Sequence, residues 1–311
     1  MKFDLPLAKA PDSIWTAIEA SLTEPRSSGS GHPYLPRRLP RRPLWIAALA
    51  AAASLATAIF IWYRTPRPAW EVVRLDGSPS IASKPMAAVA KIGVGQWLQT
   101  DASSRARISV GNIGTVEIAP NTRVEVVAAR PDQQRLKLAR GEISASVSAP
   151  PRLFFVDTPA GAAVDLGCAY TMKADPDGNG LLRVTLGWVS LEWEGRESLV
   201  PAGASCRTRQ KTGPGTPYFD DASPRLRNAL ADFDFNGGGD PALAIVLAEA
   251  RIRDTLTLWH LLSRVDPTAR EGVYNRMVDL VPLPNGVEKD RALQLDPSTL
   301  KHWREELAWK W

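Results

Sequence analysis

Residues 44–63 read LWIAALAAAASLATAIFIWY and carry no formal charge. A helix of this length spans about 30 Å, which is the thickness of a bilayer's hydrocarbon core. Trp45 and Trp62 lie near its two ends, where amphipathic rings favour the lipid headgroups. Ser54 and Thr57 are too few to form the polar face that a soluble helix of this length shows. We therefore expect one transmembrane helix.

Two other interpretations of this stretch are a buried alanine-rich core helix and a cleaved signal peptide. A signal peptide normally has a short charged leader and an apolar run of about 7–15 residues. Here residues 1–43 precede a longer run, so we interpret it as an uncleaved signal anchor. Arginines are denser on its N-terminal side: Arg37, Arg38, Arg41 and Arg42 precede it, and Arg64 and Arg67 follow it. The positive-inside rule then predicts a cytoplasmic N-terminus and a periplasmic C-terminal body, anchored in the inner membrane.

The anchor divides the 311 residues unequally. We expect a cytoplasmic segment (1–43), the transmembrane helix (44–63), an all-β domain (64–210) and an α-helical region (211–311). The net charge of +5 is mild, and no long basic run with interleaved aromatic residues occurs. Nucleic acid is therefore not an expected partner.

The cytoplasmic segment contains one short amphipathic pattern. Asp12 is a candidate N-cap, and Ile14, Trp15, Ile18 and Leu22 fall on one side of the helix that follows. A helix of about three turns is marginal alone in water. These four apolar residues therefore predict a site that docks a protein, or else a helix lying on the membrane surface. The arginine-rich linker after it is expected to contact anionic lipid headgroups.

Beyond Pro68 the pattern changes to short runs of alternating apolar and polar residues, separated by turns that contain glycine. The clearest runs are 70–75, 105–110, 115–118, 123–127, 135–138, 153–156, 162–166, 182–186 and 188–193. Period-two alternation with regularly spaced turns is typical of an all-β sandwich, barrel or solenoid. No helix of normal length is expected before residue 220.

The order of these runs resembles the FecR domain, which occurs in single-pass regulators related to the ferric-citrate signalling protein of bacterial inner membranes. Residues 95–100 (GQWLQT) resemble the family's opening G-D-x-L-x-T, and residues 136–143 (LKLARGEI) resemble l-x-L-x-x-G-e-l. Other matches are the paired strands of 104–122, FVDTPAG at 155–161 with f-x-V-x-T-P-x-a, VTLGWV at 184–189 with v-x-v-x-x-G-x-V, and PAG at 201–203. The resemblance covers under half of the chain.

The chain departs from the family pattern in two places. Where the family has v-x-G-T-x-F, residues 164–170 read VDLGCAY. The long cytoplasmic helical domain of many relatives is reduced here to one predicted helix. The resemblance implies that the exported β domain receives a signal. It also implies that the cytoplasmic segment acts on an extracytoplasmic-function sigma factor.

Cys168 and Cys206 are the only cysteines, and both fall in the part that is predicted to be exported. An even pair in an oxidising compartment is a candidate disulfide. In the chain-entropy model such a bridge would contribute on the order of 3–4 kcal/mol. The alternative is two small buried thiols on neighbouring strands. The pair does not predict a zinc site, because no histidine lies near it in the sequence.

The sequence shows no catalytic arrangement, and no cofactor or metal is expected. HExxH, GxSxG and phosphate-loop patterns do not occur. Residues 175–179 (DPDGN) resemble the start of a calcium loop but lack its distal glutamate, so they predict a β-turn. Residues 237–240 (GGGD) predict a hinge before a helix. Trp97, Trp188 and Trp193 predict strand packing or, alternatively, a surface for a sugar or a protein partner.

After residue 220, four capping residues are each followed by proline: Ser223, Asp240, Asp266 and Asp296. They predict helices over about 224–232, 241–251, 254–264, 267–280 and 297–309. We expect 254–264 and 267–280 to form an antiparallel helical hairpin. Such a region either docks a partner or caps the β domain structurally.

Together these patterns predict a membrane-anchored, non-enzymatic regulator of the FecR type. Its expected partners are a sigma factor, an envelope protein and membrane lipid. The alternative is an envelope scaffold that binds a protein or a glycan without transcriptional output. An exported enzyme is a third interpretation.

Overall fold

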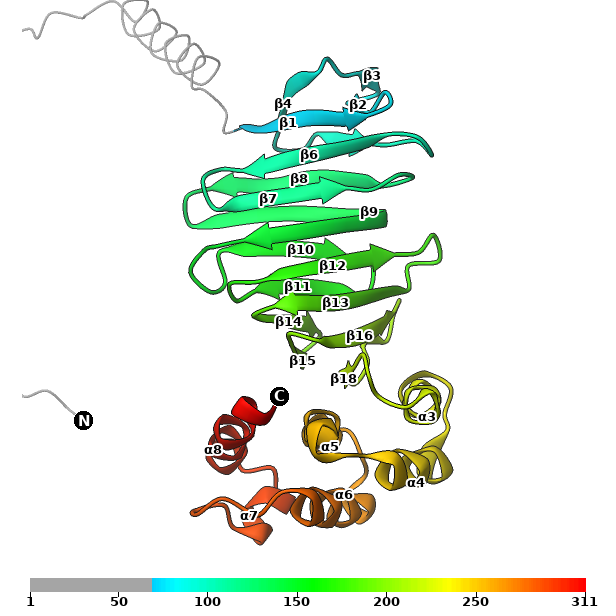
Figure 1. Ribbon diagram of the computed structural model, residues 1–311, viewed down its shortest axis with the longest axis vertical. Helices are drawn as coiled ribbons and strands as arrows, with labels where there is room; N and C mark the ends of the chain where they lie inside the picture. Colours follow the sequence, from blue (N-terminus) through cyan, green and yellow to red (C-terminus); the bar gives the residue numbers. More distant parts are fainter. Residues whose placement is uncertain (1–68) are drawn as a thin grey trace, which may run out of the picture. The chain divides into compact units, whose positions relative to one another are not determined.

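The computed structural model describes residues 69–311, which form a β domain followed by a helical region (Figure 1). The predicted transmembrane helix at 44–63 lies outside the described residues. So do the cytoplasmic segment at 1–43 and its docking residues Ile14, Trp15, Ile18 and Leu22. Among residues 69–311, no helix combines the length and the apolar character that a membrane span needs.

The β domain contains 18 strands in two layers. One layer runs β4 (Val89–Gly93), β1 (Ala69–Asp76), β6 (Arg105–Val110), β7 (Gly114–Ile118), the second half of β9 (Gln133–Val147), β12 (Ala169–Ala174), β13 (Gly180–Leu186) and β16 (Ala204–Arg209), with β17 (Gly213–Pro214) and β18 (Tyr218–Phe219) beside β16. The other runs β3 (Lys84–Pro85), β2 (Ser80–Ile81), β5 (Trp97–Gln99), β8 (Arg123–Arg130), the first half of β9, β10 (Phe154–Thr158), β11 (Gly161–Asp165), β14 (Trp188–Trp193) and β15 (Arg196–Pro201). All these neighbours are antiparallel except β9 and β10, which are parallel, so the sheet is mixed.

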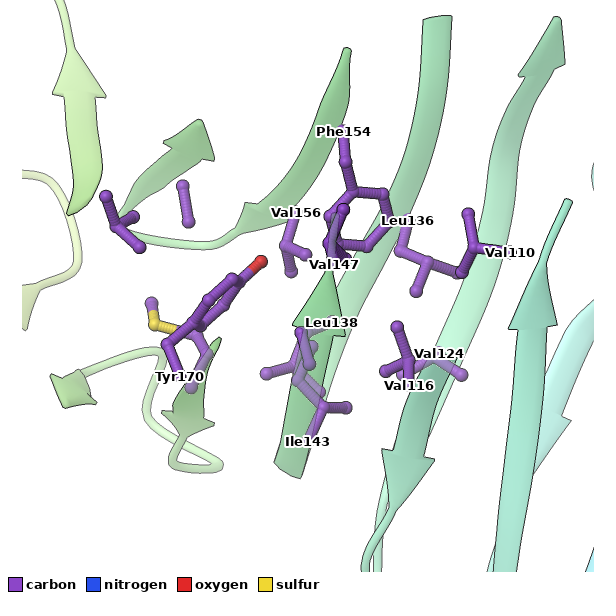
Figure 2. Packing of buried hydrophobic residues seen from close by; sticks show 14 of the residues in the cluster. Val110, Val116, Val124, Leu136, Leu138, Ile143, Val147, Phe154, Val156 and Tyr170 are labelled. Atoms are coloured by element: carbon purple, nitrogen blue, oxygen red, sulfur yellow. The ribbon is translucent and has the colours of Figure 1, made fainter. Parts of the chain in front are cut away.

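The core of the β domain lies between the two layers. In β6, Ala106, Ile108 and Val110 are buried while Arg105 and Arg107 are exposed, as period-two alternation predicts. Figure 2 shows side chains from both layers gathered in one cluster. The predicted strand runs are confirmed, and residues 69–219 contain no helix.

The long strand β9 changes layers at Gly141. Gly141 has a φ of +95°, a conformation that side chains other than hydrogen disfavour. A Cβ at this position would lie 2.4 Å from the Cα of Thr122, so a side chain has no room. The Thr122 hydroxyl accepts the backbone N–H of Glu142 at 3.0 Å and fixes the strand just after its bend. The two layers are therefore joined through one continuous strand.

The helical region consists of α3 (Pro224–Phe235), α4 (Gly239–Glu249), the 3-10 turn η1 (Ile252–Asp254), α5 (Thr255–Leu262), α6 (Pro267–Leu280), α7 (Lys289–Leu293), α8 (Pro297–Leu307) and the 3-10 turn η2 (Ala308–Lys310). Ser223 and Asp296 cap α3 and α8 through their side chains, as predicted. Asp266 occupies the N-cap of α6 without a side-chain bond. Asp240 was expected to be a cap but lies inside α4, which begins one residue earlier at Gly239.

Two details differ from the sequence-based expectation. Strands β17 and β18 follow residue 210, because the glycine- and proline-rich segment after it pairs with β16 instead of forming a free linker. The short helix α7 was not predicted, because its five residues carry too little periodic signal.

Candidate functional site at the junction of strands and helices

Helix α5 joins the β domain to the helical region. Its apolar residues divide between two cores: Leu256 belongs to the cluster between the β layers, while Leu258 and Leu261 belong to the cluster among the helices. Thr257, which is fully buried, donates its hydroxyl hydrogen to the carbonyl of Pro217 at 2.8 Å. The helix is therefore held by both parts of the fold.

His260 of α5 binds the backbone of an outer strand. Its Nε2 accepts the N–H of Leu199 in β15 at 3.0 Å, and its Nδ1 lies 2.9 Å from the carbonyl of Leu256. Because a carbonyl only accepts, Nδ1 carries the hydrogen and the ring is neutral. Burial lowers the pKa of His260 to about 3, and the positive charges of Arg264 and Arg304 act in the same direction.

Arg264 forms the centre of a second buried group. Its guanidinium donates to Thr216 Oγ1 at 2.9 Å and to Ser198 Oγ at 2.7 Å. Asp234 lies 3.9 Å away, and the side chains of Arg264 and Asp234 are only 7% and 5% exposed. The carboxylate accepts both the backbone N–H and the hydroxyl of Thr216, at 2.6 and 2.8 Å. The network ties α3 and the residues just after α5 to β15 and to the segment before α3.

Burial shapes the charge of this network. Burial raises the pKa of Asp234, while Arg264 and the two hydrogen bonds from Thr216 act in the opposite direction. Burial also lowers the pKa of Arg264, and the carboxylate of Asp234 opposes that shift. Each charge therefore depends on the other, which makes the pair sensitive to the loss of either partner.

Three tryptophans complete the junction. The ring of Trp311 lies 6.2 Å from that of Trp188 and 6.3 Å from that of Trp259, measured between centroids. The Trp311 indole donates to Thr255 Oγ1 at 3.0 Å. Trp188, which the sequence suggested for strand packing or for a partner surface, lies on β14 with its ring beside that of Trp311.

The other tryptophans that the sequence singled out lie on the β domain. The Arg123 guanidinium covers the ring of Trp97 at 4.2 Å from its centroid. The side chain of Trp193 lies against Gly213, where an added Cβ would come within 2.5 Å of the ring. Both rings contact neighbouring residues of the fold.

Two glycine-containing segments have the structures that the sequence predicts. Gly178 donates its N–H to the carbonyl of Asp175 at 2.9 Å, which forms the predicted β-turn. Gly237, with a φ of +72°, lies between α3 and α4 as the predicted hinge. Across residues 69–311, no cluster of three or more histidine, cysteine, aspartate or glutamate side chains is arranged to hold a metal ion.

The candidate disulfide is absent, because both cysteines are free, buried thiols. Strand β13 lies between them: Ala169, next to Cys168, faces Leu186, whereas Cys206 faces Leu182. At ~3.3 Å per residue along β13 and ~4.8 Å per strand spacing, the two are far beyond the Cα separation of about 7 Å that a bridge tolerates. The alternative prediction, two buried thiols on neighbouring strands, is not met either, because β13 separates the strands beside which the two cysteines lie.

Each thiol instead has a local partner. Cys168 donates to Asp165 Oδ2 at 2.7 Å, and Cys206 donates to the carbonyl of Gly215 at 3.1 Å. Burial raises the pKa of Cys206 to about 12 and raises that of Cys168 as well. Both thiols are therefore protonated and unreactive near neutral pH.

Apart from Trp188, the sequence did not single out the residues of this junction. Leu199 and His260 lie 61 positions apart, and Ser198 and Arg264 lie 66 apart. The one local signal was a histidine in the middle of the strongly apolar α5, where a polar ring needs buried partners.

Two kinds of comparison with known proteins find matches to part of this chain. Residues 96–189 match the family model described as "FecR protein", so this part of the chain is a FecR domain. No curated protein matches the chain. Two crystal structures of a "putative anti-sigma factor" from Parabacteroides distasonis, at 1.65 and 2.50 Å resolution, each match with 16% identity, 43% of this chain covered and a TM-score of 0.36. The match covers 63% and 62% of those two chains, which is less than two thirds of their length.

Proposed function

We propose that this chain is a single-pass regulator of the FecR type in the inner membrane. Its β domain receives a signal outside the membrane, and its N-terminal segment acts on a cytoplasmic sigma factor. One observation carries the proposal: a FecR domain at 96–189 follows the uncharged stretch at 44–63. The excess of arginine before that stretch supports the orientation.

The junction supports a structural role for the helical region within the exported body. Leu199 and Pro217 of the strand-rich part bind side chains of α5 directly, and Ser198 binds Arg264 just after that helix. A single transmembrane helix transmits small changes of shape poorly. Regulated proteolysis near the membrane, or a change in association between chains, is therefore the mechanism that we favour for passing the signal.

Reporter fusions test the topology. A reporter that is active only in the periplasm, fused after residue 40, is expected to be silent, and the same reporter fused after residue 75 is expected to be active. A cytoplasmic reporter should give the reverse pattern. Periplasmic activity at the first junction would contradict the proposed orientation.

Capture from membranes tests the sigma-factor role. The full-length chain is expected to retain a sigma factor, and the double variant Trp15→Ala, Ile18→Ala should lose it. Ser13→Ala and Ser21→Ala, in the same segment, serve as matched controls. Failure of the unaltered chain to retain any sigma factor would favour the envelope scaffold that binds a protein or glycan without transcriptional output.

A further inference from the structure

A polar pocket of about 510 Å³ opens at the junction. The turn at Glu194 and Gly195, which joins β14 to β15, forms one side, and residues of α5 and α8 form the other. Its volume falls within the range of about 300–1,000 Å³ that small-molecule sites occupy. The pocket therefore lies where the β domain and the helical region both supply side chains.

Three guanidinium groups line this pocket. Arg264 is already bound to Ser198, Thr216 and Asp234. Arg196 of β15 and Arg304 of α8 form no ion pair or side-chain hydrogen bond with any residue in 69–311. Guanidinium groups bind carboxylates with two parallel hydrogen bonds, which makes these two arginines suitable for an oxyanion.

The remaining lining residues narrow the class of ligand. Glu194 and Glu197 lie at the same pocket and are exposed, so they disfavour a ligand with several negative charges. Glu197 already accepts the hydroxyl of Ser190 at 2.7 Å. The half-buried ring of Trp259 supplies an apolar wall, and the Arg304 guanidinium lies 5.9 Å from the centroid of that ring.

We propose that this pocket binds a small organic acid with a single carboxylate and an apolar body. The carboxylate lies between Arg196 and Arg304, and the apolar body lies against Trp259. One arginine comes from the β domain and the other from the helical region, so the ligand bridges the junction. The inference concerns the body at 69–311 and does not depend on the sigma-factor role.

Calorimetric titration of the full-length chain with sodium hexanoate tests the proposal. Saturable binding with one site per chain is expected at pH 7. Hexanamide, which has the same body without the charge, should bind at least tenfold more weakly. Inorganic phosphate should also bind at least tenfold more weakly because of the two glutamates. Raising the salt concentration should weaken the binding of hexanoate.

Variants assign the binding to the pocket. Arg196→Gln and Arg304→Gln should each reduce the affinity for hexanoate at least tenfold, and Arg304→Lys should reduce it less than Arg304→Gln. Arg207→Gln, at an exposed position of β16 outside the pocket, should leave it unchanged. Unfolding curves show whether each variant folds. If one of the two arginine variants does not fold, the result for the other variant tests the proposal. The proposal is overturned if hexanoate does not bind, or if folded pocket variants bind it like Arg207→Gln.

Discussion

His260 and Leu199 are separated by 61 positions in the chain, yet the ring nitrogen of one accepts the backbone N–H of the other at 3.0 Å. Leu199 lies in β15, which pairs with β14 on one side only. Strands at the border of a sheet expose unpaired backbone groups to other chains. The neutral imidazole satisfies one of these groups, and Arg264 donates to another, the carbonyl of Glu197, at 3.2 Å.

The protonation of His260 should make the stability of the fold depend on pH. The native ring has a pKa of about 3, whereas an unfolded histidine titrates near 6.5. Below pH 6.5 the histidine of the unfolded chain is protonated, whereas the native ring stays neutral. The free energy of unfolding therefore falls as the pH falls. The slope approaches about 1.4 kcal/mol per pH unit. Above pH 6.5 this contribution is fully present.

Urea unfolding between pH 7 and pH 4.5 measures the effect. The unaltered chain should lose stability more steeply than His260→Gln, because glutamine does not titrate. Subtracting the stability curve of His260→Gln from that of the unaltered chain cancels the contribution of the carboxyl groups, which both proteins share. Parallel curves would show that His260 is not buried in its neutral form.

Asp234 should be essential for the buried network. Asp234→Asn leaves the guanidinium of Arg264 buried without its counter-charge, and breaking a buried pair in this way costs about 3–5 kcal/mol. Asp232→Asn, two positions earlier in α3 and exposed, should change the free energy of unfolding by less than about 0.5 kcal/mol. Equal effects in chemical denaturation would mean that the pair contributes nothing specific.

Gly141 should tolerate no side chain. Gly141→Ala adds backbone strain and forces a Cβ against Thr122, so a loss of about 2 kcal/mol or more is expected. Gly95 also has a positive φ, of +81°, but nothing lies within 4 Å of an added Cβ. Gly95→Ala therefore measures the backbone strain alone, about 1 kcal/mol. A loss in Gly141→Ala no larger than this would contradict the close packing at the bend.

Tyr170 should be replaceable by phenylalanine with a gain in stability. Its side chain is 2% exposed, and its hydroxyl has no hydrogen-bond partner among residues 69–311. An unsatisfied buried polar group costs about 1–3 kcal/mol. Tyr170→Phe should therefore raise the midpoint of thermal unfolding. A lower midpoint would mean that the Tyr170 hydroxyl makes a stabilising hydrogen bond in the folded protein.

The thiols should be free but protected. A thiol reagent is expected to label neither Cys168 nor Cys206 in the folded protein, because both are at most 2% exposed. After denaturation without a reductant, both should be labelled. Labelling that requires prior reduction would establish a bridge between them.

Local sequence patterns predict many of the strands and helices of this fold. Alternation places Ala106, Ile108 and Val110 on the buried side of β6, and a strand follows from that pattern alone. Ser223 and Asp296 mark helix starts because a side-chain oxygen followed by proline suits the first turn. These signals extend over a few residues, so one sequence is enough to find them.

The arrangement of these elements depends on contacts that local patterns do not encode. The passage of β9 between layers depends on the room that Thr122 leaves beside Gly141, and the pairing of the cysteines depends on strand register. The oxidising compartment suggested a disulfide, yet the register keeps the two thiols apart. The pocket arginines, Arg196 and Arg304, come from elements more than 100 positions apart.

The closure of β15 by α5 gives the β domain two unlike ends. At this end the backbone N–H of Leu199 and the carbonyl of Glu197 are already engaged, which leaves fewer free backbone groups for a strand from another molecule to pair with. A stack of strands is the geometry from which endless fibres grow, and the engaged backbone of β15 disfavours such growth from this end.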